Sequence, residues 1–376
     1  MTNSATARSL AILGTRGVPA GHGGFETFAA RLAPWLVARG WQVTVYCQID
    51  GSGAVTEDEW QGVHRVNIPI DRAGAVGTMQ FDWRTIDEVL RRPRTLLLTL
   101  GYNTALFTGR LKARGFTNVI NMDGLEWMRA KWKAHERGWL WLNERAGARF
   151  GTHLVADHPE IERHLQGFAP ARKITMIPYG ADDVTGADPA PLAAIGVEPD
   201  RFLSVIARPE PENSFLEIVR AFSRRPRGYR LLVLGKFDRA GNDYHGAVLD
   251  AASNEVMFPG PIYEADRIAA IRAHSTLYCH GHTVGGTNPS LVEALGAGAA
   301  VLAHDNPFNR WVAGDGGRYF PGEDGCANAL DRLLAAPAER QAMRAASTAR
   351  FGERFRWEQV LGEYEDMLSQ HLVGQA

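Results

Sequence analysis

The chain has 376 residues, of which 45% are hydrophobic and 22% charged, and its formal net charge is −1. This length and composition predict about two soluble globular domains, and a net charge near zero argues against nucleic acid as a partner. The three cysteines form no CxxC pair, which excludes a disulfide framework and a cysteine metal site. Residues 1–8 lack an apolar signal-peptide core, and no apolar run is long enough to span a membrane. We therefore expect a cytoplasmic protein.

The chain opens with a predicted strand at residues 9–13, a glycine-rich loop at 14–24, a helix at 25–39 and a strand at 41–47. This order is Rossmann-like, but the loop is too long for the GxGxxG pattern of dinucleotide-binding proteins. Gly17, Gly23 and Gly24 would let the backbone approach a phosphate, which predicts a role in donor binding. The alternative is a plain connection between strand and helix.

Strand and helix patterns then alternate up to residue 180, with strands predicted at 64–70, 95–100, 119–122, 152–156 and 174–178. Asp123 and Glu126 follow the strand at 119–122, a typical ligand position at the carboxyl end of a parallel strand. We expect a long helical stretch from Asp123 to about Phe150.

Residues 127–150 place four tryptophans among six arginines and lysines. Such basic and aromatic helices often lie at membrane interfaces, which predicts peripheral contact with the inner face of a cell membrane. The alternative is a core helix with a solvated face.

Residues 181–200 are rich in Ala, Gly, Pro and Asp without a clear period, which predicts an inter-domain linker. A second α/β series occupies 201–355, with strands at 202–207, 229–234 and 256–258. The helix at 356–376 is expected to pack back on the first domain, residues 1–180. Two successive βαβ series predict two Rossmann-like domains facing a shared cleft.

The most informative stretch lies at residues 276–304, where a strand, a glycine-rich turn, a helix and another strand follow one another. Asn288 is predicted to cap the helix and Pro289 to be its first residue. The free N–H groups of such a helix start favour a phosphate. Glu293 lies just over one turn inside the helix, where we expect it to reach a sugar hydroxyl of the ligand.

Five segments together resemble a known family. They are Gly14-Thr15-Arg16-Gly17-Val18-Pro19, Gly23-Gly24-Phe25-Glu26-Thr27-Phe28, Asn121-Met122-Asp123-Gly124-Leu125-Glu126-Trp127, Ala156-Asp157-His158-Pro159-Glu160 and residues 280–290. The chain resembles the GT-B glycosyltransferases, in particular the retaining glycosyltransferase family 4 and its bacterial rhamnosyltransferases of polysaccharide assembly. The resemblance covers nearly the whole chain.

The resemblance implies transfer of a sugar, with retention and without a metal or other cofactor, from a nucleotide diphosphate donor, here dTDP-L-rhamnose. The acceptor would be a saccharide or a lipid-linked saccharide. By position, Arg208 would neutralise the leaving diphosphate, Glu293 would hold the donor ribose and Asp123 would orient the acceptor. The remaining implied contacts are for the donor Gly17, Gly23, Gly24, Lys236, His282, Gly285, Gly286, Thr287, Asn288 and Ser290, and for the acceptor Glu126 and Trp127.

Two positions depart from the family pattern. The first glutamate of its Glu-x7-Glu motif falls on Gly285, and the lysine that usually follows the arginine by five positions falls on Asn213. Lys236 is the expected replacement cation. These departures keep two alternatives open: a GT-B epimerase acting on a nucleotide sugar, and a catalytically inactive nucleotide-sugar-binding protein.

Overall fold

The computed structural model describes residues 8–21, 23–129 and 131–372. The chain forms two compact units: unit 1 comprises residues 1–127, 132–178 and 358–376, and unit 2 comprises residues 128–131 and 179–357. Residue 22 of the predicted phosphate loop and most of the N-terminal segment lie outside the described residues.

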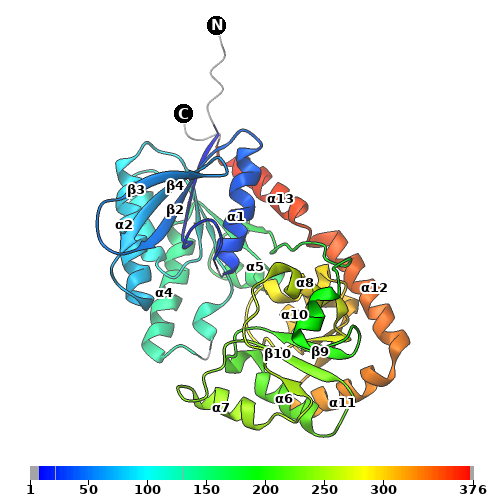
Figure 1. Ribbon diagram of the computed structural model, residues 1–376. Coiled ribbons are helices and arrows are strands. Elements are labelled where there is room, and N and C mark those ends of the chain that lie inside the picture. The colour runs from blue at the N-terminus through cyan, green and yellow to red at the C-terminus, as the bar shows by residue number, and fades with distance from the viewer. Residues whose placement is uncertain (1–7, 22, 130, 373–376) are drawn as a thin grey trace. The chain divides into compact units, whose positions relative to one another are not determined.

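Unit 1 is built on an eight-stranded sheet in the order β3-β4-β2-β1-β5-β6-β7-β8 (Figure 1). All neighbouring strands are parallel except β3 and β4. Its strands are β1 Ser9–Leu13, β2 Gln42–Asp50, β3 Thr56–Trp60, β4 Val63–Ile70, β5 Leu96–Leu100, β6 Asn118–Asn121, β7 His153–Ala156 and β8 Ile174–Met176. Its helices are α1 Gly24–Val37, α2 Gly74–Arg91, α3 Gly109–Ala113, α4 Ala134–Phe150, α5 Pro159–Gln166 and α13 Trp357–Gln370, with short 3-10 turns η1 Ala105–Thr108, η2 Glu126–Met128 and η3 Ala171–Lys173.

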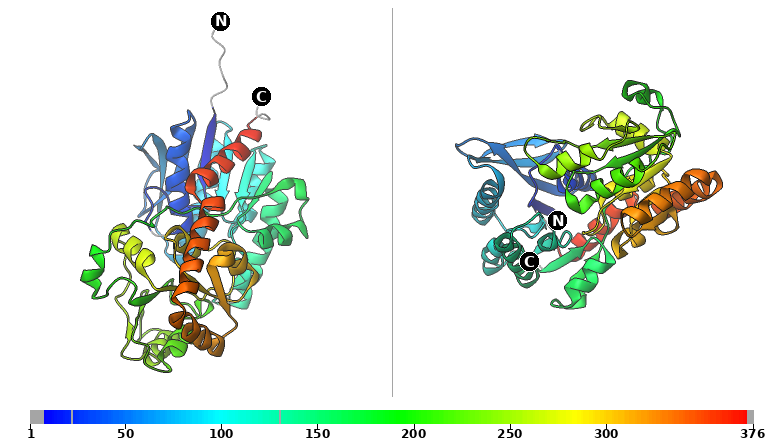
Figure 2. Two further views of the ribbon diagram at one scale, coloured as in Figure 1. Left: turned by 90° about the vertical axis from the view of Figure 1, so that its right-hand side faces the viewer. Right: turned by 90° about the horizontal axis from the view of Figure 1, so that it is seen from below.

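The central strands of unit 1 are apolar along their whole length because both faces of the sheet are covered. In β5, the residues Leu96, Leu97 and Leu98 have no exposed surface. Four central positions of α13 belong to this core: Val360, Tyr364, Met367 and Leu368 are buried. Figure 2 shows α13, in red, beside the blue α1, and the ring of Tyr364 lies 4.6 Å from that of Phe28 on α1.

Unit 2 is built on a six-stranded parallel sheet in the order β11-β10-β9-β12-β13-β14. Its strands are β9 Phe202–Ile206, β10 Arg230–Leu234, β11 Val256–Met257, β12 Leu277–His280, β13 Val301–His304 and β14 Gly317–Phe320. Its helices are α6 Phe215–Ser223, α7 Asp243–Asp250, α8 Ala265–His274, α9 Pro289–Gly296, α10 Pro307–Ala313, α11 Glu323–Ala335 and α12 Pro337–Arg354, with 3-10 turns η4 Ala190–Ile195, η5 Pro211–Asn213 and η6 Gly314–Gly316. The two doubly wound sheets confirm the predicted α/β fold class.

Residues 181–200, expected to be a linker, are part of unit 2. Leu192 and Val197 are buried and pack in one core cluster with Phe202 of β9. The segment lacks a helical period because it forms only the short η4 turn, so its apolar residues are spaced irregularly.

The helix expected to run from Asp123 to Phe150 is interrupted. The backbone of Asp123 has a φ of 49°, which ends any regular structure there, and α4 begins only at Ala134. Glu136 marks the true start, because its carboxylate accepts the backbone N–H of Lys133 at 2.8 Å and closes a capping box.

Candidate active site

The topology of unit 2 places two loops at the point where ligands bind in open α/β sheets. Strand β9 is central, the chain continues through β10 and β11 on one side, and it returns through β12, β13 and β14 on the other. The loops after the neighbouring strands β9 and β12 therefore run in opposite directions. Between them lies a crevice outside the carboxyl ends of the strands. Arg208 lies in the first loop, and His282 and Gly285 lie in the second.

The start of α9 has the predicted geometry. The side chain of Asn288 accepts the backbone N–H of Ser290 at 3.0 Å, and Pro289 is the first helical residue. The hydroxyl of Ser290 donates to the carbonyl of Ile206 at 2.8 Å and also contacts the hydroxyl of Tyr278. Ser290 thereby links α9 to β9. Its hydroxyl is already engaged within the protein, and its contact with a donor stays a prediction.

The glycine-rich turn before α9 includes Gly285, Gly286 and the buried Thr287. Gly285 has a φ of 149°, in the region that L side chains rarely adopt. A Cβ at this position would lie 3.2 Å from Nε2 of His282. Where the resemblance predicts a carboxylate, the structure has a backbone turn next to an imidazole.

Asn213 fixes the protonation of that imidazole. The Asn213 Nδ2 donates to the carbonyl of Arg208 at 2.7 Å, so its Oδ1 is the atom that faces Nδ1 of His282. An amide oxygen only accepts, and Nδ1 must therefore carry the proton. Burial, with a smaller repulsion from His280, lowers the pKa of His282 well below its ordinary value. His282 is neutral, and its Nε2 is a hydrogen-bond acceptor beside Gly285.

Two hydrogen bonds to backbone carbonyls hold the loops after β9 and β12 together. Thr283 donates its N–H to the carbonyl of Glu212 at 2.9 Å, and Ser214 donates its hydroxyl to the carbonyl of Gly281 at 2.8 Å. A side chain at Gly281 would collide with the carbonyl of Asn213. The His282–Asn213 pair therefore lies on a rigid support.

Two further residues that hold the His282 backbone were not predicted from the sequence. Asn306 and Asn309, at the start of α10, each donate a side-chain N–H to the carbonyl of His282 at 2.9 Å. Asn306 also caps α10 ahead of Pro307. This Asn-Pro signal repeats that of Asn288 and Pro289, and it could have indicated a second capped helix at the same edge of the sheet.

Arg208 follows β9, and its side chain is exposed. Within the described part of the chain, no carboxylate pairs with its guanidinium, which leaves its five N–H donors for a ligand. Lys236 is exposed after the neighbouring strand β10. Both predicted cations thus lie at the carboxyl edge of the sheet.

Glu293 has a protein partner that the sequence did not predict. Its carboxylate forms an ion pair with Arg272 of α8, and its side chain is 33% exposed. Burial is the largest influence and raises the pKa of Glu293 against the opposing effect of Arg272. The pair fixes one oxygen of the carboxylate.

In unit 1, Asp123 adopts a left-handed backbone conformation that is uncommon for residues other than glycine, which makes it a candidate for a functional position. Its N–H donates to Oδ1 of Asn121 at 2.9 Å. The buried Tyr102 supports the same turn, because its hydroxyl donates to the carbonyl of Gly124 at 3.1 Å and accepts the N–H of Glu126 at 2.9 Å.

The other two acceptor candidates, Glu126 and Trp127, are half-buried with polar groups already engaged. The indole N–H of Trp127 donates to the buried Glu144 at 3.2 Å, and that of Trp132 donates to Glu126 at 3.4 Å. Trp139 likewise donates to the carbonyl of Asn103 at 2.9 Å. Of the four tryptophans in residues 127–150, only Trp141 is exposed.

The predicted phosphate loop of unit 1 is tightly packed. Gly17 has a φ of 125°, and a Cβ there would lie 2.7 Å from the Cβ of Cys47. A Cβ at Gly23 would collide with the carboxylate of Glu26, which accepts the backbone N–H of Arg16 at 3.2 Å. Gly17 is therefore required by packing, whereas the Glu26 side chain could move away from a Cβ at Gly23. The contact of both glycines with a donor stays a prediction.

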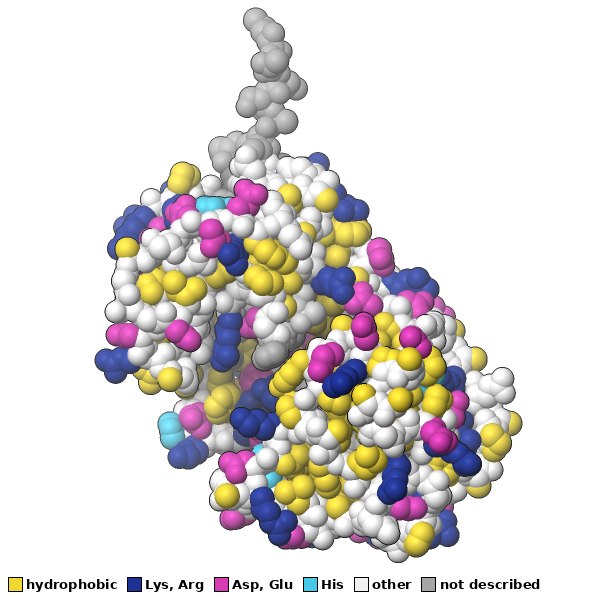
Figure 3. Space-filling view, viewed as in Figure 1, with side chains coloured by type: hydrophobic (Ala, Val, Ile, Leu, Met, Phe, Trp, Pro, Cys, Tyr) yellow, Lys and Arg dark blue, Asp and Glu magenta, His cyan; other side chains and the backbone are white. Residues whose placement is uncertain are grey.

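Neither a metal centre nor a membrane span is built from the residues that the structure describes. No group of three or more His, Cys, Asp or Glu side chains there could hold a metal ion. No helix in the same residues is long and apolar enough to cross a bilayer. Figure 3 shows acidic and basic side chains interspersed over the visible face, as expected for a net charge of −1.

Each half of the chain matches a known protein family model. Residues 213–366 match a family model described as "Glycosyl transferase-like", and residues 7–182 match a "Domain of unknown function (DUF1972)". A phosphatidyl-myo-inositol mannosyltransferase of Mycolicibacterium smegmatis is 31% identical over 205 residues, which cover 52% of this chain. The chain spans about half the length of this curated relative, since the match covers 50% of it.

Solved structures share the whole fold. A sucrose-phosphate synthase from Thermosynechococcus elongatus has a TM-score of 0.83 at 17% identity, covering 97% of this chain and 99% of that one. Anabaena HepE in complex with UDP and glucose has a TM-score of 0.74 at 16% identity, covering 96% and 100%. The chain therefore has the α/β fold of the GT-B glycosyltransferase structures.

Proposed function

We propose that the protein is a retaining glycosyltransferase that transfers a sugar from a nucleotide diphosphate donor to a saccharide or lipid-linked saccharide. The observation that carries this proposal is the crevice of unit 2, where the unpaired Arg208, the His282 loop and the start of α9 meet at one switch point. The arrangement suits a ligand with a diphosphate at its centre, because a guanidinium grips two phosphate oxygens and helix-start N–H groups favour anions.

The roles follow from charge and position. Arg208 and Lys236 neutralise the charge that develops on the leaving diphosphate, and Glu293 accepts a hydrogen bond from the donor ribose. Stabilising that charge is usually the largest catalytic contribution of such a site. The departing phosphate oxygen accepts the proton of the acceptor hydroxyl, so Asp123 needs only to orient the acceptor.

For the donor sugar we propose L-rhamnose, supplied as dTDP-L-rhamnose. Gly285 offers no carboxylate for the ring hydroxyls of a D-hexose, and the neutral Nε2 of His282 offers a single acceptor in its place. A site that lacks a hydrogen-bond partner loses discrimination for the corresponding hydroxyl. A 6-deoxy sugar, which presents different edges, suits this pair.

We further propose that unit 1 works at a membrane surface, in keeping with a lipid-linked acceptor in polysaccharide assembly. The support is an exposed apolar pair on α4, Trp141 and Leu142, each 45% exposed, on a helix that also carries the exposed Arg137 and Arg149. Anionic lipid attracts such basic residues by about 1 kcal/mol each when they lie close to the surface.

Incubation with candidate donors, followed by chromatography, tests the proposal. dTDP-rhamnose, UDP-glucose, UDP-N-acetylglucosamine and GDP-mannose are each supplied with and without a lipid-linked or short saccharide acceptor. We expect release of nucleotide diphosphate from dTDP-rhamnose only with acceptor. Conversion of the sugar without acceptor would identify an epimerase, binding without turnover an inactive binder, and transfer from a D-sugar alone would overturn the donor assignment.

A further inference from the structure

Unit 1 contains a switch point of its own. Strand β1 is central, β2 lies on one side of it and β5 on the other, and both pairs are parallel. The loops after β1 and β5, at residues 14–16 and 101–104, leave these strands at one edge and line a cavity of about 230 Å³. The same topological argument that marks the crevice of unit 2 therefore marks this cavity as a binding site.

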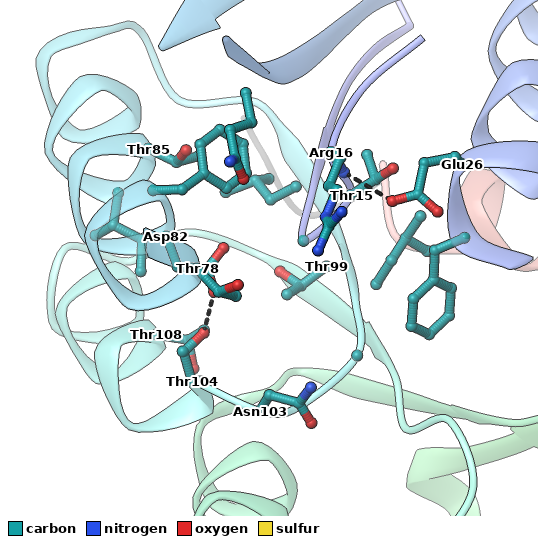
Figure 4. A pocket seen from close by; sticks show the side chains of 18 of the residues that line it. Thr15, Arg16, Glu26, Thr78, Asp82, Thr85, Thr99, Asn103, Thr104 and Thr108 are labelled. Carbon is teal, nitrogen blue, oxygen red and sulfur yellow. Dashed lines mark hydrogen bonds between the residues drawn. The ribbon is translucent and has the colours of Figure 1, made fainter. Parts of the chain in front are cut away.

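The wall of the cavity is a hydroxyl-rich face of α2. Thr78, Asp82 and Thr85 lie four and three residues apart, which puts them on one side of the helix, and all three line the cavity (Figure 4). Further polar side chains of the lining are Thr15, Glu26, Gln48, Thr99, Asn103, Thr104 and Thr108. Hydroxyl groups both donate and accept, so this lining matches a ligand that does the same.

Asp82 is the centre of this lining. Its Oδ2 accepts the hydroxyl of Thr104 at 2.7 Å, drawn as the dashed line in Figure 4. No other hydrogen bond or ion pair links Asp82 to the described residues, so its Oδ1 remains available to a ligand. Burial raises the pKa of this carboxyl to about 6, and the hydrogen bond from Thr104 offsets part of that increase.

Thr85 carries a buried, unsatisfied hydroxyl next to the cavity. Its side chain is 1% exposed, and its hydroxyl has no hydrogen-bond partner among the residues that the structure describes. Because surrounding atoms enclose this hydroxyl, Thr85 borders the cavity without offering its oxygen to a ligand.

We propose that this cavity binds one unphosphorylated sugar ring of the acceptor through its hydroxyl groups, with Asp82 and Thr104 as its contacts. The volume is below the range of about 300–1,000 Å³ for drug-sized ligands, which fits a single ring. Asp82 disfavours a phosphate inside the cavity by like-charge repulsion. Arg16 lines the same cavity with an exposed side chain, so an anionic group would be held nearer to the surface. The inference rests on the proposed function, because it names the acceptor class of that reaction.

The test observes the threonine methyl groups by NMR in the full chain labelled with ¹³C. The probes are the methyl glycosides of L-rhamnose, D-mannose, D-glucose and N-acetylglucosamine at millimolar concentration, with inorganic phosphate as the anionic probe. We expect at least one glycoside to shift the signals of Thr85 and Thr104. Asp82→Asn should weaken that binding by about 10–100-fold, the usual loss for a hydrogen bond to a charged group.

Asp87→Asn is the matched control, because Asp87 lies on the same helix and pairs with Arg110 at 2.6 Å outside the cavity lining. It should bind glycosides as the wild type does. Should Asp82→Asn unfold, Thr104→Val serves in its place, with a loss of up to about tenfold because a neutral hydroxyl forms the weaker hydrogen bond. The proposal is overturned if no glycoside shifts these signals, if phosphate shifts them as strongly, or if neither variant weakens binding.

Two further readouts separate this proposal from the proposed function. In the transfer reaction, Asp82→Asn should raise the KM for the acceptor and leave the KM for the donor unchanged. Saturation-transfer NMR of dTDP and UDP reports the nucleotide independently. Glycoside binding without nucleotide binding would overturn the transferase assignment alone, and transfer with an unchanged acceptor KM in Asp82→Asn would overturn the cavity assignment alone.

Discussion

His282 and Asn213 form a neutral hydrogen-bonded pair at the switch point of unit 2, in which the ring Nδ1–H donates to the amide oxygen. By resemblance to the retaining glycosyltransferases, Asn213 stands where a lysine is usual, and His282 lies beside the glycine that stands where a glutamate is usual. Relative to that pattern, one positive and one negative group are absent together. In the proposed function, the neutral pair would contact sugar hydroxyls without changing the net charge around the diphosphate.

Nitrogen-15 NMR of the histidine rings tests this pair. His282 is expected to be neutral near pH 7 and protonated on Nδ1. His245 is an internal control of the opposite tautomer, because its Nδ1 accepts the N–H of Asp238 at 2.9 Å and its Nε2 faces the carbonyl of Pro209 at 2.9 Å. Asn213→Leu should abolish the preference of His282 and lower transfer about tenfold, as losses of supporting hydrogen bonds do. An imidazolium or Nε2–H form of His282 in the wild type would contradict the assignment.

Arg208→Ala should lower kcat about 100-fold or more, the usual loss when one stabilising donor is removed from a developing charge. Arg208→Lys should recover only part of the rate, since an ammonium does not grip two oxygens in one plane. Arg201→Ala is the control. Arg201 is exposed and lies just before the start of β9, at the opposite end of that strand from Arg208. Steady-state kinetics with varied donor measures all three, and equal rates for the Arg208 and Arg201 variants would remove Arg208 from the mechanism.

Glu293→Gln should weaken nucleotide binding as well as turnover, because the amide is a poorer acceptor for a ribose hydroxyl and leaves Arg272 unpaired. A loss of about tenfold is expected in nucleotide titrations followed by calorimetry. Glu264→Gln, on an exposed side chain of the same unit, should bind nucleotide normally. Unchanged nucleotide affinity in Glu293→Gln would assign the Glu293–Arg272 pair to the fold alone.

Acid should destabilise unit 2 through His280. Burial lowers the pKa of this ring to about 3, and its Nε2 has no hydrogen-bond partner among the described residues. Because the unfolded state takes up the proton near pH 6.5, stability is present above that pH and is lost as pH falls toward 3. The loss from this one group is about 1.4 kcal/mol per pH unit.

Urea unfolding at several pH values between 7.5 and 5 measures this effect. His280→Phe keeps an aromatic ring and should lose less stability on acidification than the wild type. Burial also lowers the pKa values of His282 and His304, so part of the acid sensitivity should remain. His135→Gln, at an exposed position of α4, should follow the wild type, and parallel curves for wild type and His280→Phe would refute the assignment.

Sedimentation with anionic vesicles tests the membrane proposal. The double variant Trp141→Ala and Leu142→Ala should bind at least severalfold less than the wild type at low salt, and salt should weaken wild-type binding. Tyr263→Ala removes a side chain of unit 2 that is 65% exposed and should have no effect. Equal sedimentation of all three proteins would leave α4 as a helix of the fold with a solvated face.

The regular elements were predictable because their signals are local. The apolar runs of β1 and β5, and the Asn288-Pro289 start of α9, specify their structures within a few residues. Prediction failed where the conformation depends on distant contacts. The turn at Asp123 is supported by the hydroxyl of Tyr102, which contacts Gly124 and Glu126, and residues 181–200 are ordered by the core around Phe202.

The positions of the candidate site residues were predictable to the same degree. Arg208 lies after a strand and Glu293 within a helix, as expected, and their roles stay predictions. The partner of Glu293 comes from α8 and has no local signal. The role of Asn213 was equally hidden, since its contact with His282 joins residues 69 positions apart. Asp82 and Thr85 lie inside an ordinary amphipathic helix, and only the fold reveals that their shared face borders a cavity.

The last described helix contacts the candidate acceptor region through Tyr364. Asn121 donates its amide N–H to the hydroxyl of Tyr364, 243 residues later in the chain, and its Oδ1 holds the N–H of Asp123. During synthesis the N-terminal part of a chain folds first. The turn at Asp123 receives this support only after α13 has left the ribosome, so unit 1 is completed only when its C-terminal helix has been synthesised.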